Sequence, residues 1–195
     1  MAAKCETCGT ELRTKALRGR APRFCSPYCR LAAHRIAHRA EPGIPAELRS
    51  LDRWVRYSSR KVPLTTTGRA ASSTNPATWS TYAEAVASKA GAGIGFVLNG
   101  DGLCCLDLDH CLEDGRPTPA ARRFLYKLPR TYIEVSPSGE GLHVWGFAYV
   151  PTGRQLVVDG LFVEAYGTGR YMTVTGRPFT TAPLAHLTDV VASLI

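Results

Sequence analysis

The sequence predicts an α+β protein in which a small N-terminal metal-binding module precedes a strand-rich domain. Four cysteines stand in two close pairs before residue 30, and a stretch with two prolines and a glycine follows them. In the remainder, segments with the alternation of strands outnumber those with the period of helices. We therefore expect a module at 1–40, a linker at 41–47 and a second domain at 48–195, a length that suffices for one well-buried core.

The cysteine spacing of the first module is typical of a zinc site. Cys5 and Cys8 form a C-x2-C pair, and Cys25 and Cys29 form a C-x3-C pair. Each short loop presents two thiolates to one tetrahedral Zn²⁺, so we predict a structural zinc finger held by these four residues. The arrangement resembles treble-clef zinc fingers.

A helix is expected to start at the second cysteine pair. In RFCSPYCRLAAHRIAHR, Ser26 has the position of an N-cap and Pro27 that of the first helical residue. His34 and His38 are alternative zinc ligands, but four cysteines already complete the shell, so we interpret both as exposed helix residues.

Positive charge is concentrated in this module. Residues 1–40 hold nine Lys and Arg against two Glu, a net charge of +7, which leaves +1 of the total of +8 for the remainder. A Zn²⁺ ion bound by four thiolates would lower the module's charge to about +5. This asymmetry predicts a polyanionic partner, with a solvated basic surface as the alternative.

The second domain is expected to run mainly as strands. Expected strands cover 53–58, 93–98, 102–109, 131–136, 141–147, 160–166 and 170–176, and expected helices cover 79–90 and 119–128. No apolar run approaches the roughly 20 residues of a membrane span, and MAAKCETCGT lacks the apolar core of a signal peptide. Seven cysteines, an odd number, argue against a disulfide framework. We therefore expect a cytoplasmic protein without a membrane partner.

Two aspartates interrupt an apolar strand in CLDLDHC. Residues at i and i+2 share a face, so Cys105, Asp107 and Asp109 are expected on one side and the leucines between them on the other. Two carboxylates about 6 to 7 Å apart along a strand can share divalent ions, which neutralise their repulsion. A D-x-D pair at an exposed strand end is the alternative.

A glycine-rich turn opens onto a further polar strand in EVSPSGEGLHVWGF. Ser138, Gly139 and Gly141 lie in a turn whose backbone N–H groups are suited to cradle phosphate oxygens. The following strand presents His143 on the face of Trp145 and Phe147, close to whatever the turn binds. A structural histidine is the alternative.

A third acid alternates with apolar residues in LFVEAYGTGRYMTVTG. Glu164 shares a face with Phe162 and Tyr166. Two aspartates on one strand and an acid on another form the set that a two-metal phosphoryl-transfer site requires, so we expect these three carboxylates to lie within about 4 to 8 Å of one another around Mg²⁺ or Mn²⁺.

The order LDLDH, SPSGEGLHVW, VEAYGTGRYMTVTG resembles the archaeo-eukaryotic primase superfamily, and more narrowly the bifunctional DNA primase-polymerase domain of phage and plasmid replication proteins. The resemblance covers about residues 50–180 and includes RWVRYSSRKVPLTTTG and NPATWSTYAEA. It implies a two-subdomain catalytic core of RNA-recognition-motif type, with a sheet and flanking helices. It further implies that Asp107 and Asp109 are the first metal-binding motif, that Ser138, Gly139 and His143 bind nucleotide, and that Glu164 is the third acid.

Other polar residues leave alternatives open. Lys61 and Arg170 can pair with triphosphate or template backbone, or serve as solvated or core-capping residues. Cys104, Cys105 and Cys111 are expected to be buried free thiols, with a second metal site that includes His110 as the alternative.

These observations together predict a nucleotidyltransferase of phage or plasmid replication. It would make or extend primers on single-stranded DNA from nucleoside triphosphates, with Mg²⁺ or Mn²⁺ at the carboxylates and structural Zn²⁺ in the finger. We expect any helicase to be a separate protein, because the chain stops at Ile195, and the site of action to be the cytoplasm of a bacterial host. The alternatives are a metal-dependent nuclease and a non-catalytic zinc-containing DNA-binding or replication-initiation protein.

Overall fold

A computed structural model describes residues 4–5, 10–12, 22–27, 29 and 43–194 of the chain. The chain divides into two compact units, Met1–Pro42 and Gly43–Ile195. The second unit thus begins inside the expected linker at 41–47. Ile44 and Leu48 are buried beside the short helix α2 (Ala46–Arg49), and Trp54 Nε1 donates a hydrogen bond of 3.2 Å to the Leu48 carbonyl. Apolar side chains within the proline-containing stretch therefore fold with the second unit.

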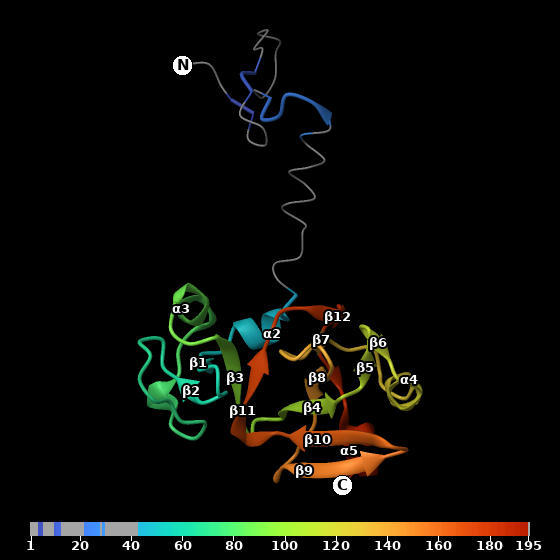
Figure 1. The fold of residues 1–195 in the computed structure, drawn as a ribbon. Coiled ribbons are helices and arrows are strands. Elements are labelled where there is room, and N and C mark those ends of the chain that lie inside the picture. The colour runs from blue at the N-terminus through green and yellow to red at the C-terminus, as the bar shows by residue number, and fades with distance from the viewer. Residues whose placement is uncertain (1–3, 6–9, 13–21, 28, 30–42, 195) are drawn as a thin grey trace. The chain divides into compact units, whose positions relative to one another are not determined.

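The second unit contains two main antiparallel sheets (Figure 1). The smaller has the strand order β11-β3-β1-β2, with the bounds Thr168–Val174, Gly93–Asn99, Trp54–Tyr57 and Pro63–Leu64. The larger has the order β12-β7-β8-β4-β10-β9, with the bounds Pro178–Thr180, Ile133–Val135, Leu142–Phe147, Leu103–Asp109, Leu161–Tyr166 and Arg154–Val158.

Short strands complete the architecture. β13 (Ala185–His186) pairs in parallel with the end of β8, and β5 (Leu112–Glu113) forms a hairpin with β6 (Arg116–Pro117). The seven strands expected from the sequence are present, whereas β2, β5, β6, β9, β12 and β13 were not predicted.

The chain passes between the two sheets three times, and the first two crossings run through glycines that lie next to each other. β3 leads into β4 through Gly100 and Gly102, whose φ angles of +90° and +96° disfavour residues with a Cβ. β10 leads into β11 through Gly167, whose carbonyl accepts a hydrogen bond from the Gly100 N–H at 2.9 Å. The two crossings are therefore bonded to each other, and both begin or end on strands that carry candidate site residues.

The helices of the second unit are short. The expected helix at 79–90 is shorter, α3 (Tyr82–Ala87), because Thr81 and Glu84 form a capping box at its start and Ser88 is extended at its end. The other predicted helix is α4 (Pro119–Tyr126), which starts at the N-cap Thr118. A 3-10 turn (Pro76–Thr78) and the final helix α5 (Thr188–Leu194) were not predicted.

Two apolar clusters hold these elements together. One covers the face of the larger sheet that carries Cys104, Leu106 and Leu108, and includes residues of α4 and α5. The other joins the two sheets, where Phe96 packs edge-on against Trp145 at 5.9 Å between ring centroids. The fold is therefore α+β and rich in sheet, as predicted. In the described part of the chain, no helix has the length and apolar character needed to cross a bilayer.

Candidate active site

A row of polar side chains crosses five strands of the larger sheet. Cα pairing sets Glu134 of β7 opposite His143 of β8, and His143 opposite Asp107 of β4. Asp107 is opposite Glu164 of β10, which in turn is opposite Gln155 of β9. Directly opposed residues of antiparallel strands share a face, so all five side chains project from the same side of the sheet. We call Glu134, His143, Asp107, Glu164 and Gln155 the polar row.

Three carboxylates converge beside this row. Asp109 lies two residues beyond Asp107 on β4, and ligand oxygens of Asp107, Asp109 and Glu164 lie within 4.8 Å of one another. The predicted proximity of these acids is thus present. The Asp107 Oδ1 atom is inaccessible to solvent and accepts no hydrogen bond from any residue that the structure describes. An orphaned buried oxygen next to two further carboxylates is a donor set suited to a divalent cation.

The surroundings of Asp107 disfavour the ionised form of its carboxyl group. Burial raises the pKa of this carboxyl, the positive charge of His143 works in the opposite direction, and the negative charges of Asp109 and Glu164 raise the pKa further. Glu164 is better supplied with partners, since the Gln155 side-chain amide and the Tyr166 hydroxyl both donate to it, the latter at 2.9 Å. Asp107 is therefore the carboxylate that would gain most from a cation.

His143 lies between two acids and is almost completely buried. Its Nδ1 is 3.3 Å from Glu134 Oε1, and its Nε2 is 3.6 Å from Asp107 Oδ1. Burial lowers the pKa of the ring, but the hydrogen bond to Glu134 and the charge of Asp107 outweigh burial, so the pKa is raised above its ordinary value. The protonated ring can therefore persist beside the carboxylates and offer an N–H to an anion.

A pocket of about 370 Å³ opens over these groups. Its walls come from β4 and β8, from the turn between β7 and β8, from the β1–β2 loop, from the loop before the 3-10 turn and from β11. The lining residues are Lys61, Pro63, Ser73, Asp107, Asp109, Ser136, Pro137, Ser138, His143, Gly169, Arg170, Tyr171, Met172 and Thr173. Both sheets thus contribute to one polar pocket.

The glycine-rich turn is held by hydrogen bonds of its own. Ser138 lines the pocket, but the N–H groups of Gly139, Glu140 and Gly141 donate within the turn, to the Ser136 carbonyl, to Ser138 Oγ and to Ser136 Oγ respectively. In this structure the three N–H groups therefore have partners within the turn, and their role as a phosphate cradle stays a prediction. Gly139 provides a φ of +86°, and a Cβ on Gly141 would lie 2.8 Å from the Leu108 carbonyl oxygen, so both glycines shape the turn.

Both cationic candidates lie at the pocket. Lys61 is exposed, has a φ of 57°, and its carbonyl accepts a hydrogen bond from the Tyr171 hydroxyl. The Arg170 guanidinium stacks 4.0 Å from the centroid of the Tyr166 ring and lies 3.9 Å from Glu164 Oε2. These positions favour contact with a bound anion over a core-capping role.

Two members of the polar row were not predicted. Glu134 alternates with Ile133 and Val135 in an expected strand, the same signal that identified Glu164. Gln155 lies on β9, a largely exposed strand whose residues do not alternate between polar and apolar, so nothing in the sequence indicated it.

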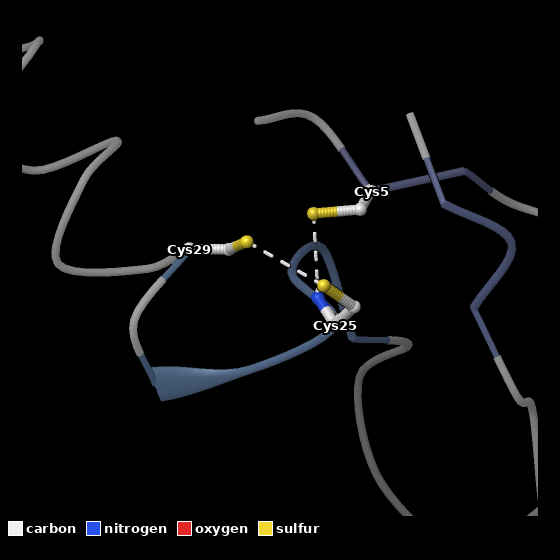
Figure 2. A group of neighbouring side chains, drawn as sticks. All are labelled: Cys5, Cys25 and Cys29. Atoms are coloured by element: carbon white, nitrogen blue, oxygen red, sulfur yellow. Dashed lines mark hydrogen bonds between the residues drawn. The ribbon is translucent and has the colours of Figure 1, made fainter. Parts of the chain in front are cut away.

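The first unit brings three of its four predicted zinc ligands together (Figure 2). Ligand sulfurs of Cys5, Cys25 and Cys29 lie within 4.8 Å of one another, and the Cys25 N–H donates to the Cys5 sulfur at 3.4 Å. The Cys29 N–H donates to Ser26 Oγ at 3.1 Å, the hydrogen bond expected of an N-cap. Three thiols so placed fit a thiophilic ion such as Zn²⁺. Cys8 and the alternative ligands at positions 34 and 38 lie outside the described residues.

The cysteines near the aspartates are buried free thiols. Burial raises the pKa of both Cys104 and Cys111 to about 12. Cys105 joins the core between the sheets, and His110 is exposed, 3.1 Å from Glu140. The alternative of a second metal site with His110 is not supported by this arrangement.

Comparison with known proteins identifies the family. The family model described as bifunctional DNA primase/polymerase, N-terminal, matches residues 33–184, a range that includes the whole polar row. A DNA primase-polymerase of Nitratiruptor phage NrS-1 is 38% identical over 136 residues, which are 65% of this chain. The chain matches 19% of the length of that phage protein. Since the family model covers most of the chain, the chain belongs to the bifunctional DNA primase/polymerase family.

Proposed function

We propose that this protein is a DNA-dependent nucleotidyltransferase that synthesises or extends primers on single-stranded DNA during phage or plasmid replication. The observation that carries the proposal is the convergence of Asp107, Asp109 and Glu164, with an orphaned oxygen on Asp107, beside a polar pocket that the two aspartates line. Family membership supports the same reaction class. The partners are then single-stranded DNA and nucleoside triphosphates, in the cytoplasm of a bacterial host.

Three carboxylates would hold the divalent ions. Asp107, Asp109 and Glu164 supply the oxygen ligands that Mg²⁺ and Mn²⁺ prefer. When bound, such ions activate an attacking 3′-hydroxyl and neutralise the charge of a triphosphate. The Tyr166 hydroxyl and the Gln155 amide orient Glu164, so that its position does not depend on the ion.

The remaining pocket residues bind and orient the triphosphate in this proposal. His143 offers Nε2 from a buried position, Ser138 offers a hydroxyl from the turn, and Lys61 and Arg170 bring positive charge to the pocket. The burial of His143 keeps the donor fixed before substrate arrives, which avoids reorganisation during the reaction.

The first unit would bind structural zinc through Cys5, Cys8, Cys25 and Cys29 and add affinity for the template. The support is the thiol cluster of Figure 2 and the net charge of +7 over residues 1–40. A module with so small an apolar core depends on its metal for folding. The unit therefore acts in binding, while the chemistry belongs to the second unit. A separate replicative helicase would open the duplex.

Nucleotide incorporation tests the proposal directly. The full-length protein is incubated with labelled nucleotides on single-stranded DNA, with and without a primer, in Mg²⁺ and in Mn²⁺. We expect template-dependent incorporation that Asp107→Asn reduces far more than tenfold, a loss well above about 1.4 kcal/mol in the barrier.

The matched control is Asp114→Asn, an exposed aspartate with a φ of 49° that asparagine tolerates equally well. We expect this variant to keep wild-type activity. Degradation of the labelled DNA without incorporation would indicate a metal-dependent nuclease, and DNA binding without either reaction would indicate a non-catalytic binding protein.

A further inference from the structure

Glu134 is a completely buried carboxylate that the reaction proposed above does not use. It lies on β7 directly opposite His143 of β8, and its relative exposure is 0%. A carboxylate removed from water costs several kcal/mol unless hydrogen-bond donors surround it. The surroundings of this group therefore indicate why it is present.

The two oxygens of Glu134 have different partners. Oε2 accepts hydrogen bonds from the Tyr132 hydroxyl at 3.0 Å, the Thr175 N–H at 3.1 Å, the Thr175 hydroxyl at 3.3 Å and the Gly176 N–H at 2.9 Å. Oε1 lies 3.3 Å from His143 Nδ1. Oε2 thus anchors the carboxylate to fixed backbone groups, and Oε1 is directed at the imidazole.

The anchor also links the two sides of the pocket. Thr175 and Gly176 directly follow β11, whose residues from Gly169 to Thr173 line one wall. His143 lies on the opposite wall, on β8. One carboxylate therefore sets the position of the histidine ring relative to the strand that faces it across the pocket.

The chemistry of the pair fixes the ring's hydrogen. An ionised carboxylate can only accept hydrogen bonds. The imidazole nitrogen that faces Glu134 must therefore carry a hydrogen. Nε2 then points away from Glu134, toward Asp107 at 3.6 Å and the pocket.

We propose that Glu134 is a positioning residue that keeps a hydrogen on Nδ1 of His143 and thereby holds the ring with Nε2 directed at the nucleotide. The effect on nucleotide binding rests on the proposed function. The orientation of the ring rests on the geometry of Glu134 alone. Carboxylates orient metal-ligating histidines in the same manner, and their loss costs roughly 10- to 100-fold in function.

Glu134→Gln replaces one of the two acceptor oxygens with an NH₂ group. The glutamine carbonyl can occupy the position of Oε2, where two backbone N–H groups require an acceptor, or the position of Oε1, but not both. With the carbonyl at Oε2, the amide NH₂ faces His143 Nδ1, which must then accept. The variant is therefore expected to leave Nδ1 of His143 without a hydrogen.

The matched control is Tyr132→Phe. This change removes one donor to Oε2 from a buried ring of nearly the same shape and leaves Oε1 facing His143. It tests whether loss of stability alone produces the effect, because it weakens the anchor without changing the chemistry at Nδ1.

Nitrogen NMR of the histidine side chains reads the ring hydrogen without any substrate. The His143 signals are assigned by their disappearance in His143→Ala. We expect a hydrogen on Nδ1 in the wild type and in Tyr132→Phe, and an unprotonated Nδ1 in Glu134→Gln. An unprotonated Nδ1 in the wild-type protein would overturn the proposal even if Glu134→Gln failed to fold.

Incorporation kinetics then measure the consequence. Glu134→Gln is expected to lower kcat/KM by roughly 10- to 100-fold, and to have no further effect in a His143→Ala background, because the positioned ring is absent. Equal losses in both backgrounds would show that Glu134 acts through general stability and would contradict the proposal. If the wild-type protein incorporates no nucleotide, the proposed function fails, while the NMR result still decides the role of Glu134.

Discussion

Asp107 is the residue at which folding and function conflict. It is a largely buried carboxylate next to two other acids, and one of its oxygens has no hydrogen-bond partner among the described residues. Such an atom lowers the stability of the metal-free fold, because neither water nor a donor solvates it. The site therefore keeps a carboxylate that His143 compensates only in part and that a bound cation would neutralise further.

Asp107→Asn is expected to raise the melting temperature of the metal-free protein. Since the pKa of Asp107 is raised in the folded state, its contribution to stability is present at low pH and is lost as the pH rises above about 4 toward the folded pKa. Asp107→Asn has no such ionisation. The difference in melting temperature between the variant and the wild type should therefore grow between pH 4 and pH 7.5. Thermal melts in EDTA measure the difference.

The same variant provides a metal test. Mg²⁺ should stabilise the wild-type protein by mass action and should stabilise Asp107→Asn much less. A wild-type protein that remains less stable than the variant at millimolar Mg²⁺ and shows no shift would indicate that Asp107 is not a metal ligand.

The buried thiols are expected to resist alkylation. With a pKa raised to about 12, Cys104 and Cys111 hold almost no thiolate at pH 7.5, and both are inaccessible in the core. Mass spectrometry after iodoacetamide treatment should find them unmodified in the native protein and fully modified in denaturant. Rapid native modification of Cys104 would contradict its burial in the core on β4.

At the scale of elements, α3 depends on its first turn. Thr81 and Glu84 exchange hydrogen bonds in a capping box, and these bonds lower the pKa of the exposed Glu84. The contribution of Glu84 to stability is therefore present above the ordinary glutamate pKa and lost as the pH falls through the lowered one.

Thr81→Ala is expected to destabilise the second unit by about 1 kcal/mol at neutral pH. Thr81→Ser keeps the hydroxyl and serves as the control, and urea melts at pH 7 and near pH 3 measure both variants. The deficit should shrink at the lower pH, where the Glu84 half of the box is lost. An alanine variant as stable as wild type at pH 7 would show that packing alone holds α3.

The strength of local patterns explains which elements were predictable. β4, β8 and β10 are apolar runs interrupted by one or two ionisable residues, so Asp107, His143 and Glu164 could each be assigned to one face of a strand from the sequence. β9 has two polar residues followed by three apolar ones and therefore no alternation, and β12 and β13 are too short for any period. The position of Glu134 opposite His143 depends on the pairing of β7 with β8. That pairing is a tertiary contact, which local sequence patterns do not indicate.

At the scale of the whole molecule, charge and candidate chemistry are separated. The first forty residues carry +7, and the remainder, which holds the polar row, carries +1. We therefore expect a polyanionic template to be attracted mainly to the first unit, and the polar pocket to be spared a large non-specific field.

Removal of the first unit is expected to flatten the salt dependence of DNA binding. A protein beginning at Pro42 should bind single-stranded DNA more weakly, with a log-log slope reduced by roughly 0.7 for each lost phosphate contact. Extension of a pre-annealed primer at high DNA concentration should survive, since the polar row is retained. Salt titrations of both proteins measure the slopes.

Chelation of zinc should reproduce this result in the full-length protein, because so small a module loses its fold without metal. Identical slopes for the full-length and shortened proteins would assign the first unit a structural or protein-docking role instead.

The polar row makes activity an all-or-none property of sheet registration. Each of its five members comes from a different strand, and a shift of one residue in any strand turns that strand's side chains to the opposite face. A point substitution changes one side chain and leaves the register of the sheet intact. A single-residue insertion or deletion within β7, β8, β4, β10 or β9 instead turns one member of the polar row to the opposite face. We therefore expect length variation among functional descendants of this sequence to be confined to the loops between these strands.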